Sequence, residues 1–353
     1  MMTAFTRRPL LYFLIYNICI LVLLKVGNKF IWPVETQPVE THNFPFFEEE
    51  KVEACSSEQI RRNLDIFRTE STTCPSEPWY WEWQENLSVD EFVYIEIGCN
   101  KGTDALMNLK AFTRSKIVDI KHWQKYTNLG GFACPFDIER WELIIKKSKR
   151  GAKRYKHLCI EAAAENAKPV QAAAALLGLD KLGLYVQHAA VSSTNVPSTV
   201  KFPVILPGQE NIGIGTDNQI YKDFYDVEVF TVDQLITLHK IKQVDVLKID
   251  TEGNDPRVLI GAVKTLSMMK PSYVTFENHG IGHWETFHLE DTIDFLNALD
   301  YECFWATNSG KLIRITSCWS SEYGAVKTWS NVACYHRKND DLKVIMKKYL
   351  PDS

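Results

Sequence analysis

From about residue 89 onward, short apolar runs alternate with amphipathic stretches, and this alternation constrains the fold more than any other feature. Apolar runs bounded by turn residues predict buried strands, and strands that alternate with helices are typical of α/β domains with a mostly parallel sheet. We expect strands at Val93–Ile97, His157–Glu161, Tyr185–Ser192, Val244–Ile249 and Ser272–Glu277, with shorter strands near Phe304–Ile315 and Asn331–His336.

Helices are expected between most of these strands, and one segment interrupts the alternation. The expected helices are Asp104–Phe112, Asp137–Lys149, Ala162–Leu177, Thr231–Lys240, Asp255–Leu266 and Leu289–Ala298. In the interrupting segment, TVKFPVIL and YDVEVFTV flank the polar loop GQENIGIGTDNQ. Two apolar runs joined by a polar loop favour a β-excursion outside the regular alternation.

The apolar run Leu10–Val26 predicts a membrane-spanning helix. Its 17 residues lie at the short end of what spans a bilayer. Arg7 and Arg8 precede the run and favour a cytoplasmic N-terminus. A cleaved signal peptide is the alternative, but no small-residue cleavage site follows. We therefore expect a single-pass type II membrane protein with a lumenal domain, and the short span favours the Golgi, because thinner bilayers suit short spans.

The expected organisation has five parts. They are a cytoplasmic tail 1–9, a signal anchor 10–26, a lumenal stem 27–88, an α/β domain 89–340 and a C-terminal tail 341–353. Prolines and acidic residues predict an extended stem, followed by a short amphipathic helix at Ser57–Phe67. The cluster Trp79, Tyr80, Trp81 and Trp83 is interpreted as a packing edge against the domain rather than a ligand platform.

Nine cysteines are compatible with an oxidising lumen. Such a compartment would permit disulfides between near neighbours, such as Cys55 with Cys74 and Cys318 with Cys334. The sequence contains no Cys-x-x-Cys pair, so a structural zinc site is not expected.

The net charge, a glycosylation sequon and the predicted anchor each indicate which partners or modifications to expect. The net charge of −4 gives no reason to expect a nucleic acid, because nucleic-acid-binding proteins usually carry a basic excess. Asn86 begins a sequon, so a lumenal chain would be a glycoprotein. The anchor predicts the lipid bilayer as a partner, and the sequence gives no indication of oligomeric state.

A glycine-rich turn follows the first predicted strand, in YIEIGCNKGTD. Glu96, Gly98, Asn100 and Gly102 form the pattern, and glycines allow a sharp turn and a close approach of backbone to ligand. The spacing differs from the dinucleotide fingerprint. We interpret it as a binding turn for S-adenosylmethionine; an ordinary turn after a strand is the alternative.

Glu161 ends the second predicted strand, where Rossmann-like folds place an acidic residue that binds ribose hydroxyls. A carboxylate can accept hydrogen bonds from both hydroxyls at once. Glu161 follows Gly102 by 59 residues instead of the usual interval of about 20. A long insertion is therefore expected between the two motifs.

Charged residues crowd the ends of two later strands. VDVLKIDTEGNDPRVLIGA places Lys248, Asp250 and Glu252 at the end of a buried strand, and PSYVTFENHG places Glu277 and His279 at the end of the next. Charges are unfavourable to bury without a purpose, and ligands of open α/β sheets bind at the carboxyl ends of strands.

These motifs resemble the FkbM-type methyltransferases. The resemblance covers roughly residues 93–280 and is most specific in a run listed here: Lys248, Ile249, Asp250, Glu252, Gly253, Asp255, Val258, Leu259, Gly261 and Ala262. It implies a Rossmann-like class I methyltransferase fold, S-adenosylmethionine as cofactor, and O-methylation of a sugar, glycan or other small-molecule hydroxyl.

We assign cofactor binding to Glu96, Gly98, Asn100, Gly102, Glu161 and Asp250, catalysis to Asp250, Glu252, Glu277 and His279, and no metal ligand. Asp250 is expected to face the methyl group, and His279 could accept a proton from the acceptor. Alternatively, Lys248 and Asp250 simply form an ion pair, and His279 is a structural histidine. A magnesium site at Asp250 and Glu252, completed by Glu277 or His279, is a further alternative.

Two other functions fit parts of the sequence. An anchored lumenal α/β domain is typical of glycosyltransferases, although no Asp-x-Asp triplet occurs in the sequence. A non-catalytic binding protein could keep the methyltransferase fold without the activity.

Overall fold

A computed structural model describes residues 54–70, 77–85, 87–117, 119–131, 145, 151–193, 196–214, 220–325 and 330–351. All of them belong to one unit that spans Val52–Ser353. The predicted tail 1–9 and anchor 10–26 lie outside the described residues, as do the sequon residue Asn86 and most of the predicted helix at Asp137–Lys149. No helix in the described ranges is long and apolar enough to cross a membrane.

The main sheet has eight strands and confirms the predicted α/β fold. The strands are β1 (Ser88–Ile97), β2 (Gly151–Glu161), β3 (Leu184–His188), β7 (Val246–Ile249), β8 (Tyr273–Asn278), β9 (Tyr301–Ala306), β10 (Leu312–Arg314) and β11 (Ser330–His336). Their order is β10-β9-β11-β8-β7-β1-β2-β3. The pairs from β8 to β3 are parallel, whereas β11 pairs in antiparallel fashion with both β8 and β9.

Strand β1 lies at the point where the chain reverses its direction of travel across the sheet. Ile97 pairs with Ile160 of β2 on one side and with Ile249 of β7 on the other. The chain first builds outward through β2 and β3, and later returns to build outward through β7 and β8. Ligands of open α/β sheets bind at such a switch point, beyond the carboxyl ends of the strands.

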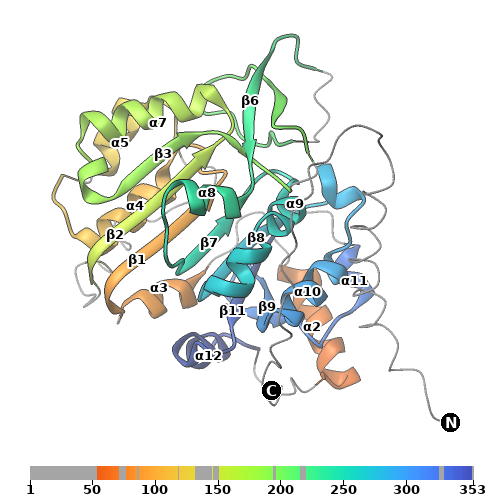
Figure 1. The fold of residues 1–353 in the computed structure, drawn as a ribbon. Coiled ribbons are helices and arrows are strands. Elements are labelled where there is room, and N and C mark those ends of the chain that lie inside the picture. Colours follow the sequence, from red (N-terminus) through yellow and green to blue (C-terminus); the bar gives the residue numbers. More distant parts are fainter. Residues whose placement is uncertain are drawn as a thin grey trace, which may run out of the picture. The chain divides into compact units, whose positions relative to one another are not determined.

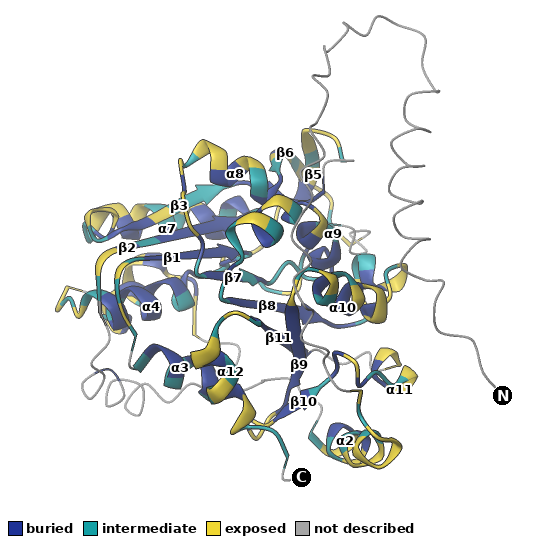
Figure 2. Ribbon diagram, turned by 60° about the horizontal axis from the view of Figure 1, so that its bottom comes forward, coloured by how far each residue is buried: buried dark blue, intermediate teal, exposed yellow. Residues whose placement is uncertain are grey.

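Helices cover both faces of the sheet (Figure 1). One apolar core joins the sheet to α3 (Pro78–Glu85), α4 (Thr103–Thr113), α5 (Ile120–Thr127), α7 (Ala164–Leu176) and α12 (Asp340–Lys347). The other core joins it to α2 (Ser57–Glu70), α8 (Val232–Leu238), α9 (Asp255–Ile260) and α10 (Leu289–Ala298). The strands between these layers are largely buried (Figure 2), because alternate side chains point into the two cores. Short turns of helix lie at η1 (Asp180–Leu182), η2 (Thr265–Met269), η3 (Gly282–Glu285) and α11 (Ser321–Gly324).

The expected β-excursion is a three-stranded sheet. It contains β4 (Ala190–Val191), β5 (Thr199–Pro203) and β6 (Phe224–Phe230), in the order β4-β6-β5. The single strand predicted at Tyr185–Ser192 is therefore wrong in extent, because β3 pairs with β2 while β4 leaves the main sheet and pairs with β6.

Several element boundaries also differ from the prediction. Strand β1 begins five residues earlier than expected, and β2 begins six residues earlier. The two strands extend together beyond their apolar runs, because pairing already begins between Ser88 and Gly151. The helix predicted at Asp255–Leu266 ends at Ile260, and the π-helical turn η2 follows.

Part of the predicted stem is built into the domain. Helix α2 confirms the predicted amphipathic helix, and its Phe67 packs against Trp305 and Tyr323. In α3, Trp79 is fully buried and its indole N–H donates to the hydroxyl of Tyr273 at 2.9 Å. The aromatic cluster is thus a packing edge, and the domain begins well before residue 89.

The predicted C-terminal tail likewise contains a packed helix. Helix α12 buries Leu342 and Met346 in the same core as α3. Residues 341–350 therefore belong to the folded unit, because their apolar side chains complete the layer over that face of the sheet.

Three disulfides occur among the described residues, and none joins the near neighbours named above as pairs that an oxidising lumen would permit. They are Cys55–Cys318, Cys99–Cys159 and Cys303–Cys334. Cys303 and Cys334 lie opposite each other on β9 and β11, so strand register determines the pairing. Proximity along the chain does not decide it.

Candidate active site

A cavity of about 850 Å³ opens at the carboxyl ends of β1, β2, β7 and β8. Its size is in the range of small-molecule and cofactor sites. Eight of the nine residues assigned to catalysis or cofactor binding line it, and so does Lys248: the lining includes Glu96, Gly98, Asn100, Glu161, Lys248, Asp250, Glu252, Glu277 and His279. The predicted site residues are thus brought together, with Gly102 as the exception.

The turn after β1 depends on Gly98. Its φ is +83°, and a Cβ atom there would lie 1.6 Å from the backbone oxygen of Asp250. The Gly98 N–H donates to the Ile160 carbonyl and the Asp250 N–H donates to the Ile97 carbonyl, both at 2.8 Å. The glycine therefore allows the ends of β1, β2 and β7 to meet at the cavity.

Gly102 serves packing rather than the cavity. It precedes α4 with φ +65°, and a Cβ atom there would lie 2.9 Å from side-chain atoms of Trp123 and Val170. It does not appear in the cavity lining, whereas its neighbours Lys101 and Thr103 do. A close approach of its backbone to a ligand is therefore not supported by the geometry.

Glu161 presents a carboxylate that is held by backbone donors. Its Oε1 accepts from the Ala163 N–H at 2.8 Å, and its Oε2 accepts from the Asn100 N–H at 2.7 Å. Burial raises the pKa of Glu161 to about 7, although these hydrogen bonds oppose the rise. Each oxygen has a further lone pair, so the carboxylate can still accept a pair of ligand hydroxyls.

Glu96 belongs to a buried polar network behind the turn. Its Oε2 contacts His157 Nε2 at 2.9 Å, and its Oε1 accepts from Lys248 Nζ at 3.2 Å. Lys248 also donates to Asp104. Both oxygens of Glu96 are engaged in this network, and its direct contact with a cofactor stays a prediction.

Asp250 borders the cavity at the end of β7. Its Oδ2 lies 3.9 Å from Lys248 Nζ, farther than the partners that Lys248 bonds directly. Burial and the charge of Glu277 raise the pKa of Asp250 well above its usual range. A simple ion pair with Lys248 therefore does not account for this carboxyl group.

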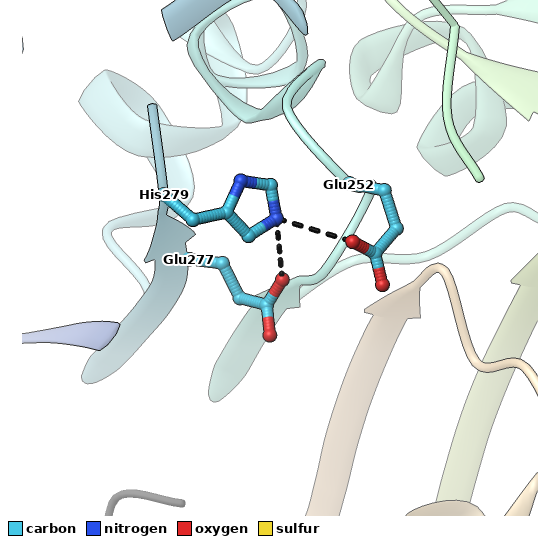
Figure 3. Close-up of side chains that lie close together, drawn as sticks. All are labelled: Glu252, Glu277 and His279. Atoms are coloured by element: carbon cyan, nitrogen blue, oxygen red, sulfur yellow. Dashed lines mark hydrogen bonds and ion pairs between the residues drawn. The ribbon is translucent and has the colours of Figure 1, made fainter. Parts of the chain in front are cut away.

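Glu252, Glu277 and His279 meet beyond the ends of β7 and β8 (Figure 3). His279 Nε2 lies 3.1 Å from Glu252 Oε2 and 3.3 Å from Glu277 Oε2. Burial alone would lower the pKa of His279, but the two glutamates raise it to about 10. The imidazole then carries a proton at neutral pH, so in this arrangement it does not serve as the general base suggested from the sequence.

The turn between β7 and α9 brings Glu252 into this group. Glu252 has φ +53°, which is uncommon for a residue other than glycine, and the following Gly253 has φ +94°. Asp255 holds the turn from the first residue of α9, because it accepts from Thr251 Oγ1 at 2.9 Å and from the Glu277 N–H at 3.2 Å.

Sequence reasoning missed two walls of the cavity. The segment 209–214 from the β-excursion forms one wall, where Lys101 Nζ pairs with Glu210 at 2.7 Å. Residues Glu77, Tyr80 and Trp81 form the other. The wall at α3 could not be predicted, because the sequence around α3 has the composition of a stem. The wall at 209–214 could have been predicted from the polar loop of the β-excursion.

One comparison with known proteins finds a match within this domain. A family model described as Methyltransferase FkbM domain matches residues 131–303, which confirms the resemblance found in the motifs. The match covers the carboxyl ends of β2, β7 and β8 but begins after the glycine turn of β1. No curated protein and no solved structure matches the chain significantly.

Proposed function

We propose that this chain, whose residues 131–303 match the methyltransferase FkbM domain, transfers a methyl group from S-adenosylmethionine to a hydroxyl of a glycan or other small molecule. The match supports a methyltransferase. The cofactor, the hydroxyl acceptor and the setting are inferred from the cavity and the sequence.

The observation that carries the proposal is the pairing of the Gly98 turn with the Glu161 carboxylate. A side chain at position 98 would strike the Asp250 backbone, so only glycine allows the turn to close beside the cavity. Glu161 lies across the turn, anchored by the Asn100 N–H. A buried carboxylate with free lone pairs fits the two hydroxyls of a ribose.

The chemistry requires positioning more than activation. When bound, S-adenosylmethionine supplies a methyl group on a positively charged sulfur. Asp250 borders the cavity next to the Gly98 turn, where such a charge would favour the ionised form of its carboxyl group and be attracted by it. Holding two reactants in line supplies much of the rate of a displacement.

The acceptor side of the cavity is polar and aromatic. Tyr80 and Trp81 of α3 line it together with Glu77, whose Oε1 accepts from Thr275 Oγ1 at 3.1 Å and Asn331 Nδ2 at 3.3 Å. Aromatic faces combined with a few fixed polar groups are typical of small-molecule sites. This lining supports a hydroxylated acceptor such as a sugar.

Calorimetric titration with S-adenosylmethionine and, separately, with a UDP-sugar tests the class of ligand. We expect binding of S-adenosylmethionine alone. Binding of the UDP-sugar alone would favour a glycosyltransferase, and cofactor binding without methyl transfer to any hydroxyl acceptor would favour a non-catalytic binding protein.

We also propose that Leu10–Val26 anchors the chain with its domain in the lumen of the secretory pathway. The three disulfides support this setting, because such bonds persist in oxidising compartments. Protease treatment of sealed microsomes should spare the domain. Its complete digestion without detergent would contradict this topology.

A further inference from the structure

The group formed by Glu252, Glu277 and His279 has the spacing of a metal-ligand set. One ligand atom from each lies within 4.8 Å of the others. Nε2 of His279 is 3.1 Å and 3.3 Å from the two carboxylate oxygens. Two ligands that each bind one ion at about 2.1 Å, with an angle of 90–110° between them, lie roughly 3.0–3.4 Å apart.

A second observation points to a missing partner for Glu277. Only 5% of this residue is exposed, and its Oε2 accepts no hydrogen bond among the described residues. This atom has the ion-pair contact with His279 Nε2, and it faces the same point as the Glu252 oxygen (Figure 3). A buried carboxylate oxygen without a hydrogen bond is unfavourable, and a bound cation would satisfy it.

The local charge also favours a cation. Four carboxyl groups gather at the ends of β7 and β8, from Asp250, Glu252, Asp255 and Glu277. Within the described ranges, the ion pairs that reach this group come from His279 and, at 3.9 Å, from Lys248. A divalent ion would supply the positive charge that these carboxylates lack.

We propose that Glu252, Glu277 and His279 bind a divalent transition-metal ion, Mn²⁺ or Zn²⁺, at the edge of the cavity. An imidazole nitrogen with two carboxylate oxygens suits such ions, whereas Mg²⁺ and Ca²⁺ prefer oxygen ligands alone. Three protein ligands leave positions open for a further oxygen. This ligand set differs from the magnesium alternative drawn from the sequence, which placed the ion at Asp250 and Glu252 with Glu277 or His279 completing the shell.

The role of the ion in methyl transfer rests on the proposed function, whereas the binding of the ion does not. All three side chains line the same cavity as Gly98 and Glu161. An ion held there would orient the oxygen of an acceptor hydroxyl and polarise its bond to hydrogen. Binding of the ion would release the Nε2 proton of His279 to solvent, and His279 would then act as a ligand through Nε2 rather than as a proton acceptor.

Calorimetric titration with the metal alone tests the site. Full-length protein without a polyhistidine tag is freed of metal with a chelator and titrated with Mn²⁺, Zn²⁺ or Mg²⁺. We expect about one Mn²⁺ or Zn²⁺ per chain, with Mg²⁺ weaker. Because loss of even an outer-shell partner costs 10- to 100-fold in affinity, Glu252→Gln and Glu277→Gln should each weaken binding by at least about tenfold.

His122→Gln is the matched control, because His122 pairs with Asp119 at 3.3 Å on the exposed surface far from this group in the sequence. Its metal affinity should equal that of the wild type. If Glu277→Gln fails to fold, Glu252→Gln keeps the test, since its side chain is partly exposed. Absence of binding, equal affinity in the glutamine variants, or preference for Mg²⁺ would overturn the proposal.

A titration of the same samples with S-adenosylmethionine separates the two proposals. Metal binding without cofactor binding would leave the metal site intact and remove the proposed function. Cofactor binding without metal binding would do the reverse.

Discussion

The ends of β1 and β2 border the same cavity as the ends of β7 and β8, but their polar groups are held in different ways. On the β1–β2 side, backbone donors hold the Glu161 carboxylate and a disulfide joins Cys99 to Cys159. On the β7–β8 side, side chains hold one another, and the Glu277 oxygen Oε2 has no hydrogen bond among the described residues.

This difference indicates that the two sides of the cavity suit different ligands. A site fixed by backbone groups needs few particular side chains and suits an invariant ligand such as a nucleoside. A site made of crowded carboxyl groups stores unfavourable charge, which is typical of positions that interact with a cation or a reacting group. Variants that damage one side and spare the other therefore test the comparison.

The largest loss of stability is expected for Gly98→Ala. This residue lies at the ends of β1 and β2, the backbone-held side of the cavity, where backbone donors hold the Glu161 carboxylate. The new Cβ atom would lie 1.6 Å from the Asp250 oxygen, so the strand ends must separate. We expect a loss of about 4 kcal/mol or more in the free energy of unfolding, measured by chemical denaturation.

Gly130→Ala is the matched control for this variant. Gly130 has a similar φ of +82°, but no atom of the described residues lies within 4 Å of its Cβ position. It should lose only about 1–2 kcal/mol, the cost of the left-handed conformation alone. Equal losses in the two variants would show that the close approach of β1 to β7 is unimportant.

The next largest effect is expected for Asp250→Asn. This residue lies at the ends of β7 and β8, where side chains hold one another. We expect the rate of methyl transfer to fall about 10²-fold, the typical scale for a positioned acid or base, while cofactor affinity changes by less than about tenfold. The melting temperature should not fall, because burial and Glu277 disfavour the charged form of Asp250, and an amide has no charged form. Full activity would eliminate the catalytic role, and unfolding would make Asp250 structural.

A smaller effect is expected from pH, on the backbone-held side. Burial raises the pKa of Glu161 to about 7, and ribose hydroxyls donate to its ionised form. Cofactor binding should therefore strengthen as the carboxyl loses its proton. We expect the dissociation constant to fall by about tenfold from pH 6 to pH 8 and then level off. Dissociation constants measured by calorimetry that do not vary across this range would contradict the assignment.

Much of the geometry at the ends of β1 and β2 could be predicted because its signals are local. The glycine turn and the acidic residue each follow an apolar run, and parallel strands bring their carboxyl ends to one edge. Asp250, Glu277 and His279 were placed near one another by the same reasoning. What spacing could not give is that both glutamates converge on one nitrogen of His279, because the turn at Glu252 has a backbone conformation uncommon outside glycine.

Contacts between residues far apart along the chain could not be predicted from the sequence. Trp79 donates a hydrogen bond to Tyr273, and Cys55 forms a disulfide with Cys318, although each pair is far apart along the chain. The prolines and acidic residues before α2 suggested an extended stem, and local composition does not reveal which distant surface a short helix covers. The boundary of the domain was therefore predicted too late in the chain.

Calorimetric titration of S-adenosylmethionine into wild type and Glu161→Gln at pH 8 tests the central claim most directly. An amide cannot accept both backbone N–H groups and both ribose hydroxyls, so we expect an affinity about 10- to 100-fold weaker in the variant. Glu290→Gln, an exposed position on α10, should bind as the wild type does. Equal affinity in wild type and Glu161→Gln, or no binding in any of the three proteins, would contradict the account.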